Sequence, residues 1–185
     1  MQGRGALSKG KLIFLIVASV AAISSMMIAP QGAVGEMVAR MEGLGNLALS
    51  SPKPLPPLDF LNPQTKGKVI VANFWALWCA PCKVEKPMLD KLQADYAKKG
   101  LIVLAIADGG DDIDAIRQYY ASHNITHLTP AKDDGGDIFS ILQLTGLPTT
   151  LIINKKGQEI GRAQGPVDWN DKDVRKILDK ELKSN

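Results

Sequence analysis

Cysteine and histidine are scarce in this chain, whose 185 residues include two of each. Two cysteines cannot form the dense disulfide framework of a small secreted domain, and a structural zinc ion usually takes four Cys or His ligands. The histidines, His123 and His127, are four residues apart, a spacing that would suit a metal on one helix face. Asn124 and Thr126 indicate, however, that the helix has already ended there. We therefore expect surface histidines and no metal site.

An excess of charge of one sign is also missing from most of the chain. The formal net charge is +3, but five of the 22 basic residues and two of the 19 acidic residues precede Leu58, so the remainder carries 17 of each. A nucleic-acid-binding surface needs a concentration of basic residues, so we expect no nucleic-acid partner. The composition, 45% hydrophobic and 22% charged, is typical of a globular protein, and no repeat is present.

Charged residues are absent from Leu12 to Ala29, a stretch that follows three basic residues. Its length is near the lower limit for a membrane-spanning helix, and basic flanks stay on the cytoplasmic side. We expect residues 1–30 to form a cytoplasmic tip and a single-pass signal-anchor in a bacterial inner membrane, with the rest in the periplasm. A cleaved signal peptide ending at Ala33-Val34-Gly35 is the alternative. Both interpretations place the cysteines outside the cytoplasm.

Glycine and proline are concentrated between residues 31 and 57, which contain eight of them. Such a composition interrupts regular structure and is typical of a linker. We therefore predict a periplasmic tether at 31–57, with at most one short amphipathic helix, and a single folded domain at 58–185.

The rest of the chain alternates between apolar runs and segments with helix signals. We predict strands at 69–74, 101–107, 126–131, 149–153 and 159–165, and helices at 80–98, 111–122, 137–144 and 170–182. Asp111 and Asp112 open the second helix, Asn170 caps the last, and Gly100 ends the first. This order predicts an α/β fold with a mainly parallel sheet, helices on both faces and the 149–165 hairpin as an antiparallel edge.

The two cysteines stand three residues apart in Trp78-Cys79-Ala80-Pro81-Cys82, directly after the first strand. A strand followed by C-x-x-C is typical of a thioredoxin-like redox motif, and the first turn of a helix brings residues i and i+3 within disulfide reach. The helix N-terminus stabilises a thiolate. We expect an exposed Cys79 to attack substrate disulfides and a shielded Cys82 to resolve the mixed disulfide, with no cofactor besides this redox-active pair. A structural disulfide and half of a zinc site are the alternatives.

Two segments carry a family resemblance over roughly residues 58–182. Residues 74–87 (FWALWCAPCKVEKP) and Gly146-Leu147-Pro148-Thr149-Thr150 resemble the exported thioredoxin-like proteins of the TlpA/ResA type. The resemblance implies a thioredoxin fold, in which a central mixed sheet is flanked by helices and an inserted helix-strand element follows residue 110. It also implies that Pro148 is a cis-proline beside the dithiol and that the backbone of Leu147 pairs with substrate.

A titratable partner for the resolving cysteine is predicted one turn along the same helix. Asn73 stands where cytosolic thioredoxins carry a buried Asp, and an amide cannot titrate. Glu85 lies three residues after Cys82, on the same side of the helix, and matches the acidic position of the exported family. We hypothesise that Glu85 tunes the proton on Cys82. An ordinary solvated glutamate is the alternative.

The residues around the nucleophile are expected to contact substrate. Trp78, Ala80 and Pro81 flank or separate the cysteines, and we assign them to the contact surface together with the Leu147-Pro148 pair. Trp75 is expected to pack in the core.

Motif, export and resemblance together predict a monomeric, membrane-anchored periplasmic protein-disulfide reductase. Because that compartment is oxidising, a membrane thiol donor of the DsbD/CcdA type must re-reduce the cysteine pair of the protein. The resemblance implies protein clients in respiratory cytochrome biogenesis: copper-site assembly proteins of cytochrome oxidase first, and the haem-attachment cysteines of apocytochrome c second. A Cu(I)-binding thioredoxin-fold chaperone and a strong oxidant are the alternatives.

Overall fold

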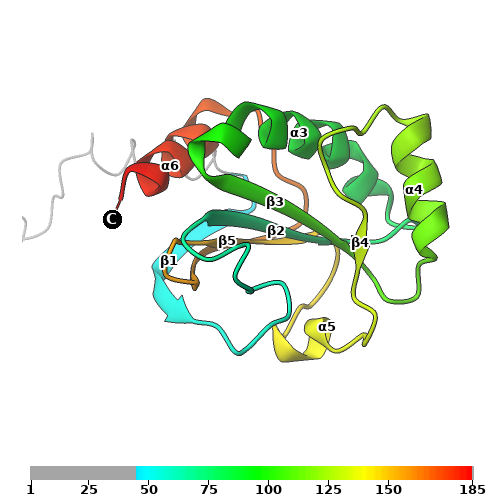
Figure 1. Cartoon of the computed structure of the whole chain (residues 1–185), viewed down its shortest axis with the longest axis horizontal. Coiled ribbons are helices and arrows are strands. Elements are labelled where there is room, and N and C mark those ends of the chain that lie inside the picture. The colour runs from blue at the N-terminus through cyan, green and yellow to red at the C-terminus, as the bar shows by residue number, and fades with distance from the viewer. Residues whose placement is uncertain (1–44, 185) are drawn as a thin grey trace, which may run out of the picture. The chain divides into compact units, whose positions relative to one another are not determined.

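A six-stranded sheet organises residues 45–184, the part of the chain that the computed structural model describes (Figure 1). Its strands lie in the order β1-β6-β5-β2-β3-β4. Their bounds are β1 Leu47–Pro54, β2 Val69–Trp75, β3 Leu101–Ala107, β4 Ala131–Lys132, β5 Thr149–Ile153 and β6 Gln158–Gln164. The helices are α3 Ala80–Tyr96, continued by the 3₁₀ turn η1 Ala97–Lys99, then α4 Ile113–Ser122, α5 Ile138–Ile141 and α6 Lys172–Lys183.

Strand β2 occupies the middle of the sheet because all seven of its residues are buried. It pairs in parallel with β3 and antiparallel with β5. Successive side chains of a strand point to opposite faces, and β2 accordingly supplies two cores. Val69, Val71 and Trp75 pack with residues of α3 and α6, whereas Ile70, Ala72 and Phe74 pack with residues around α5.

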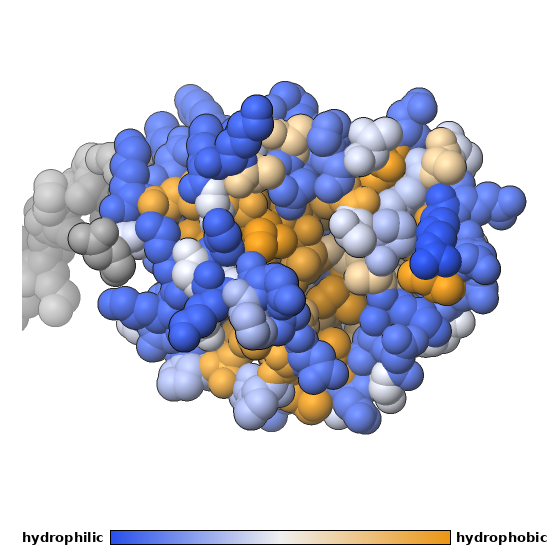
Figure 2. Space-filling model, in the orientation of Figure 1, coloured by the Kyte–Doolittle hydropathy of each residue, from blue (hydrophilic) through white to orange (hydrophobic). Residues whose placement is uncertain are grey.

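The helices cover the two faces unequally. Helices α3 and α6 lie over one face and the short α5 lies under the other (Figure 1). In the same view, apolar side chains are visible in the middle, where β2 and β3 run, and hydrophilic residues cover most of the periphery (Figure 2). The longest helix, α3, begins at the carboxyl end of β2, so the packing of α3 on the sheet positions the C-x-x-C motif.

The sheet is mixed, as the resemblance implied, but the prediction of a mainly parallel sheet is wrong. Only β2–β3 and β3–β4 are parallel, whereas β1–β6, β5–β6 and β2–β5 are antiparallel. The hairpin of β5 and β6 therefore does not form an edge. Instead β5 lies against the central β2, and β1 covers the outer side of β6.

The predicted tether at 31–57 is too long at its carboxyl end. Residues Leu47–Pro54 form β1, whose ladder with β6 pairs Leu47 with Ala163 and Pro54 with Gln158. Proline suits an edge strand, where its missing N–H is not needed by a neighbour. The folded part therefore begins before Leu58. The rest of the predicted tether before residue 45 lies outside the described residues.

Other boundaries differ by a few residues from the prediction. The strand predicted at 126–131 is the two-residue β4, and the helix predicted at 137–144 is the four-residue α5. The N-cap of α6 is Asp171 rather than Asn170, because the Asp171 carboxylate accepts hydrogen bonds from Asp173 N and Val174 N. The predicted helix at 111–122 and the strand after it are present as α4 and β4.

The anchor predicted at residues 1–30 also lies outside the described residues. Within residues 45–184, none of the helices has the length and apolar character that crossing a membrane requires.

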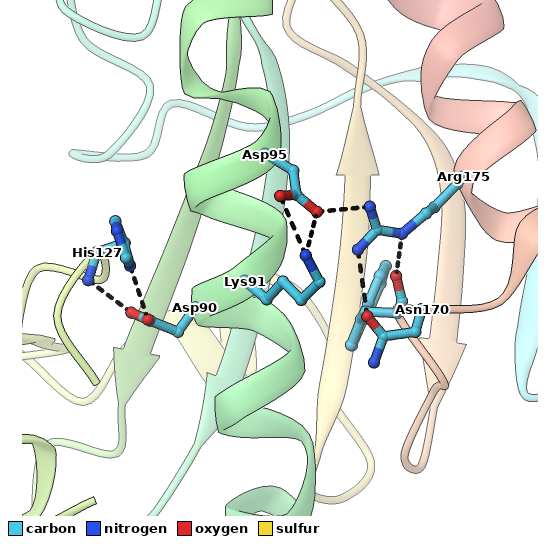
Figure 3. Close-up of polar contacts among 7 residues, drawn as sticks. Asp90, Lys91, Asp95, His127, Asn170 and Arg175 are labelled. Carbon is cyan, nitrogen blue, oxygen red and sulfur yellow. Dashed lines mark hydrogen bonds and ion pairs between the residues drawn. The ribbon is translucent and has the colours of Figure 1, made fainter. Parts of the chain in front are cut away.

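Two carboxylates fix α3 to neighbouring segments (Figure 3). The Asp90 carboxylate accepts hydrogen bonds from His127 N at 2.6 Å and Leu128 N at 2.9 Å, and lies 2.9 Å from His127 Nδ1. On the other side, Asp95 accepts from Arg175 Nη1 of α6 at 2.8 Å. Asp90 is buried, whereas the Asp95 side chain is about one-third exposed.

These burial differences predict unequal stability losses. Asp90→Ala is expected to lower the free energy of unfolding by about 3 kcal/mol, because two backbone amides would lose their acceptor. Asp95→Ala is the control and should cost less than about 1 kcal/mol, as exposed ion pairs do. Urea denaturation of the two variants measures both values, and equal losses would contradict the assignment.

Candidate active site

The two cysteines form a disulfide at the N-terminus of α3, at the position that the motif predicts. Cys79 is the N-cap residue, and its sulfur accepts a hydrogen bond from Cys82 N at 3.3 Å. Pro81 lies in the first helical turn, where a missing N–H leaves no partner unsatisfied. The Cys82 amide, which donates to this sulfur, and the dipole of the helix N-terminus favour negative charge on the Cys79 sulfur once the bond is reduced.

The two cysteines differ less in solvent exposure than predicted. Cys82 is completely buried, as expected, but Cys79 is only 4% exposed. The prediction of an exposed Cys79 is therefore wrong for the disulfide form. The bond ties the Cys79 sulfur to Cys82 on the inner face of α3, and both residues belong to the core beneath that helix.

The surface beside the disulfide is apolar and projects into solvent. Trp78 is 72% exposed, and Ala80 and Pro81 are exposed beside it. One turn further along α3, Val84 is 68% exposed, which the sequence did not single out. The expected contact residues at the motif are thus available to a partner, and Val84 extends their surface. Trp75, by contrast, is fully buried, as predicted.

The loop that carries Trp78 is held by a residue from beyond β3. The Asp111 carboxylate accepts a hydrogen bond from Leu77 N at 2.7 Å. Of the two residues predicted to open the second helix, Asp112 is the N-cap of α4, and Asp111 makes this contact instead. Parallel pairing of β2 and β3 ends both strands at the same edge of the sheet, which brings the two loops together.

The Leu147–Pro148 peptide bond is cis, as the resemblance implied. Phe74 of β2 pairs with Thr149 of β5, so this dipeptide lies beside the end of the strand that leads to the disulfide. The side chain of Leu147 packs against the same core as both cysteines. Within residues 45–184, neither the amide nor the carbonyl of Leu147 has a hydrogen-bond partner. Its backbone is therefore free to pair with an extended chain.

A buried polar network lies behind the disulfide, one turn along α3. Glu85 and Lys86 are both completely buried. Asn73 Nδ2 donates to Glu85 Oε1 at 2.6 Å and to Thr150 Oγ1 at 2.9 Å. Asn73 Oδ1 accepts from Lys86 Nζ, and the other Glu85 oxygen accepts from Val167 N at 2.9 Å. The interpretation of Glu85 as an ordinary solvated residue is therefore wrong.

Burial favours the uncharged forms of both Glu85 and Lys86. It raises the pKa of Glu85 above its ordinary value, against the opposing effects of the Val167 amide, the Lys86 ammonium and the Asn73 amide. It lowers the pKa of Lys86 to about 7, against the opposing charge of Glu85. Both groups therefore change protonation closer to neutral pH than free side chains do.

Sequence reasoning missed Lys86, although its position carried a usable signal. Cys82, Leu89, Leu92 and Tyr96 recur at the spacing of one helix face, and all four are buried. Positions 85 and 86 fall on that face, so the sequence places two charged residues where apolar ones are expected. Such a conflict between residue type and pattern is typical of functional sites.

Metal ligands are not gathered in the described part of the chain. No group of three or more His, Cys, Asp or Glu residues stands close enough there to hold an ion. The two histidines have other neighbours: His123 Nδ1 lies 2.9 Å from Tyr119 O, and His127 contacts Asp90. Helix α4 ends at Ser122, as Asn124 and Thr126 indicated, so the histidines do not share a helix face.

A C-x-x-C disulfide at a helix N-terminus, next to a cis-proline loop on a mixed sheet, defines a thioredoxin-fold protein of the dithiol–disulfide class. The match to the Redoxin family model extends over residues 49–178. The chain belongs to this family, as a thioredoxin-fold protein of the TlpA/ResA-like type.

Relatives with similar sequences are named for thiol–disulfide exchange. The chain is 30% identical over 139 residues to the thiol:disulfide interchange protein DsbE of Pseudomonas fluorescens biotype C, covering 74% of this chain and 75% of that one. It is 32% identical over 93 residues to the thiol-disulfide oxidoreductase ResA of Oceanobacillus iheyensis, covering 50% of this chain and 47% of that one. The chain thus spans about half the length of the ResA relative.

Solved structures agree with the fold. A thioredoxin family thiol:disulfide interchange protein from Chlorobium tepidum superimposes with a TM-score of 0.60 and 25% identity, covering 73% of this chain and 99% of that one.

The lowered pKa of Lys86 predicts a pH-dependent stability. The unfolded chain protonates this lysine below pH 10.5 and the folded chain only below about pH 7, so the unfolded state binds more protons between these values. The free energy of unfolding of the oxidised protein should therefore rise from pH 7 to 9.5, by at most about 1.4 kcal/mol per pH unit.

Urea denaturation across that range measures the rise. Lys86→Met should abolish it, whereas Lys98→Met, which removes an exposed lysine, should retain it. A Lys86→Met protein with the same slope as the wild type would contradict the assignment.

Proposed function

We propose that this protein is a thiol:disulfide oxidoreductase that reduces disulfides of client proteins. The observation that carries the proposal is the Cys79–Cys82 disulfide at the N-terminus of α3, beside the unpaired backbone of Leu147. The names of the ResA and DsbE relatives support the same chemistry.

The first step is attack by the reduced nucleophile. The Cys79 thiolate, stabilised by the helix N-terminus, attacks one sulfur of a client disulfide. A bond forms between Cys79 and the client, the client S–S bond breaks, and the other client sulfur leaves as a thiolate. The free amide and carbonyl of Leu147 hold the client backbone as an added strand, while Trp78 and Val84 bury its apolar side chains.

The second step releases the client. Cys82 loses its proton and attacks the Cys79 sulfur, forming the intramolecular disulfide and expelling the second client sulfur as a thiolate. The client gains two electrons, and the Cys79–Cys82 pair is oxidised. In this scheme the Glu85 carboxylate accepts the proton from Cys82, because it lies one helical turn away and both residues are completely buried. Asn73 cannot take that role, since an amide does not titrate.

The cellular setting follows from the N-terminal sequence. The uncharged segment 12–29 anchors the domain in the bacterial inner membrane with its dithiol in the periplasm. Because that compartment is oxidising, a membrane dithiol donor of the DsbD/CcdA type re-reduces the 79–82 disulfide. The redox-active pair is the only cofactor in this scheme, and the protein acts as a monomer.

The proposed clients are proteins of respiratory cytochrome biogenesis whose cysteines must be reduced before they receive metal or haem. The TlpA/ResA resemblance favours copper-site assembly proteins of cytochrome oxidase, and it makes the haem-attachment cysteines of apocytochrome c the second candidate.

Trapping in cells tests both the chemistry and the client. Cys82→Ser removes the resolving thiol, so mixed disulfides through Cys79 should accumulate and should disappear on treatment with a thiol reductant. The partner is identified by mass spectrometry after non-reducing separation. The matched control is Cys79→Ser/Cys82→Ser, which should trap nothing. Equal trapping by the control, or none by Cys82→Ser, would contradict the proposed cycle.

The direction of transfer is tested by the reduction potential. A reductase should have a potential well below the about −120 mV of the strong oxidant DsbA. Equilibration with glutathione buffers of known ratio, read by mass shift after thiol alkylation, gives the value. A potential near that of DsbA would reverse the proposed direction.

A further inference from the structure

Lys86 is a completely buried lysine that the proposed cycle leaves without a role. Lysine is almost never fully buried unless it is paired. Its ammonium group donates a hydrogen bond to Asn73 Oδ1 and lies 4.2 Å from the centre of the Trp75 ring, within cation–π range. These contacts hold the ammonium at one place in the interior, one turn beyond Cys82 on the same helix.

The Lys86 contact determines which end of the Asn73 amide faces Glu85. A side-chain amide donates only through its nitrogen and accepts only through its oxygen. Because the oxygen accepts from Lys86, the nitrogen points the other way and donates to Glu85 Oε1. With the second Glu85 oxygen accepting from Val167 N, donors reach both oxygens of the carboxylate. This arrangement favours the ionised form of Glu85.

Lys86 also supplies the positive charge that a buried carboxylate needs. An uncompensated charge in the interior costs several kcal/mol, and the electrostatic partner of Glu85 is Lys86. Among the described residues, the other titratable groups around this contact are Cys82 and Asp90 of α3 and Tyr119 and Tyr120 of α4, whose rings lie against Trp75. None of these can carry a positive charge. A further cation of α3, Lys83, lies over the Tyr119 ring and is exposed.

We propose that Lys86 is a positioning residue for the dithiol reaction: through Asn73 and by its charge, it keeps the Glu85 carboxylate ionised and oriented to accept the proton of Cys82. This inference rests on the function proposed above. It assigns to Lys86 the control of the pH at which the second, resolving step becomes fast.

The second step can be observed alone with the aromatic disulfide dithiobis(nitrobenzoate). Attack by Cys79 on this reagent releases one coloured nitrothiobenzoate, and the resolving attack by Cys82 releases a second. Stopped-flow absorbance with the reduced full chain therefore gives two phases, and the rate of the second phase is measured from pH 5 to 9. Cys82→Ser should show the first phase only.

Loss of Lys86 should shift the acid limb of the pH profile of the second-phase rate. Lys86→Met is expected to move its midpoint upward by about one pH unit, which is about a tenfold lower rate at pH values below the wild-type midpoint, with the first phase much less affected. Lys86→Gln keeps a donor for Asn73 but removes the charge, so it should show the same direction of shift. It also serves if the methionine variant fails to fold. Lys98→Met, a loss of exposed charge, should keep the wild-type profile.

The Glu85→Gln background separates a positioning role from a structural one. If Lys86 acts through Glu85, adding Lys86→Met to Glu85→Gln should change the second phase no further. Unchanged profiles in both Lys86 variants, or an additional shift in the double variant, would overturn the proposal. Failure of the proposed function looks different: the wild type would release one equivalent, or Cys82→Ser would release two.

Discussion

The arrangement of the site depends on the hydrogen bonds of one buried group, the side-chain amide of Asn73. It joins the central strand β2 to α3 through Glu85 and Lys86, and to β5 through Thr150. In a low-dielectric interior an unsatisfied member of such a network is costly, and one charge left without the other costs more. These hydrogen bonds therefore hold α3 against β2 and β5 in the arrangement that pairs Asn73 with both Glu85 and Lys86. That arrangement places Cys82 in the interior and Cys79 at the start of α3.

Around this network the sheet topology brings together segments that are distant in sequence. Because β2 lies between β3 and β5, its carboxyl end meets two other loops. One supplies Asp111, which holds the backbone of the motif loop at Leu77, and the other supplies the cis Leu147–Pro148 peptide. The disulfide, the exposed apolar surface and the free backbone of Leu147 thus converge at one edge. In the proposed cycle each serves a different part of client recognition: covalent attack, side-chain burial and strand pairing.

Sequence patterns were sufficient for most elements and insufficient for their arrangement. The apolar run of β2 and the long helix α3 have strong local signals, and both were predicted within a few residues. Strand β1 was missed because its residues stand among prolines in a region that reads as a linker. These residues form a strand because they pair with β6, which lies more than 100 residues later in the sequence. The position of β5 beside β2 was not predicted from the residue pattern for the same reason, since long-range packing and not local propensity decides which strands are neighbours.

The sequence by itself determined the reactive chemistry of this protein. Two cysteines three residues apart at a helix start are local features, and a helical turn brings them within bonding distance in any fold. Only the tertiary structure decided the environment of that chemistry. Burial of Glu85 and Lys86, and their connection through Asn73, depend on which face of α3 packs on the sheet and on the strand that lies beneath it. Desolvation and charge pairing act through space, so they arise only when those distant residues come into contact.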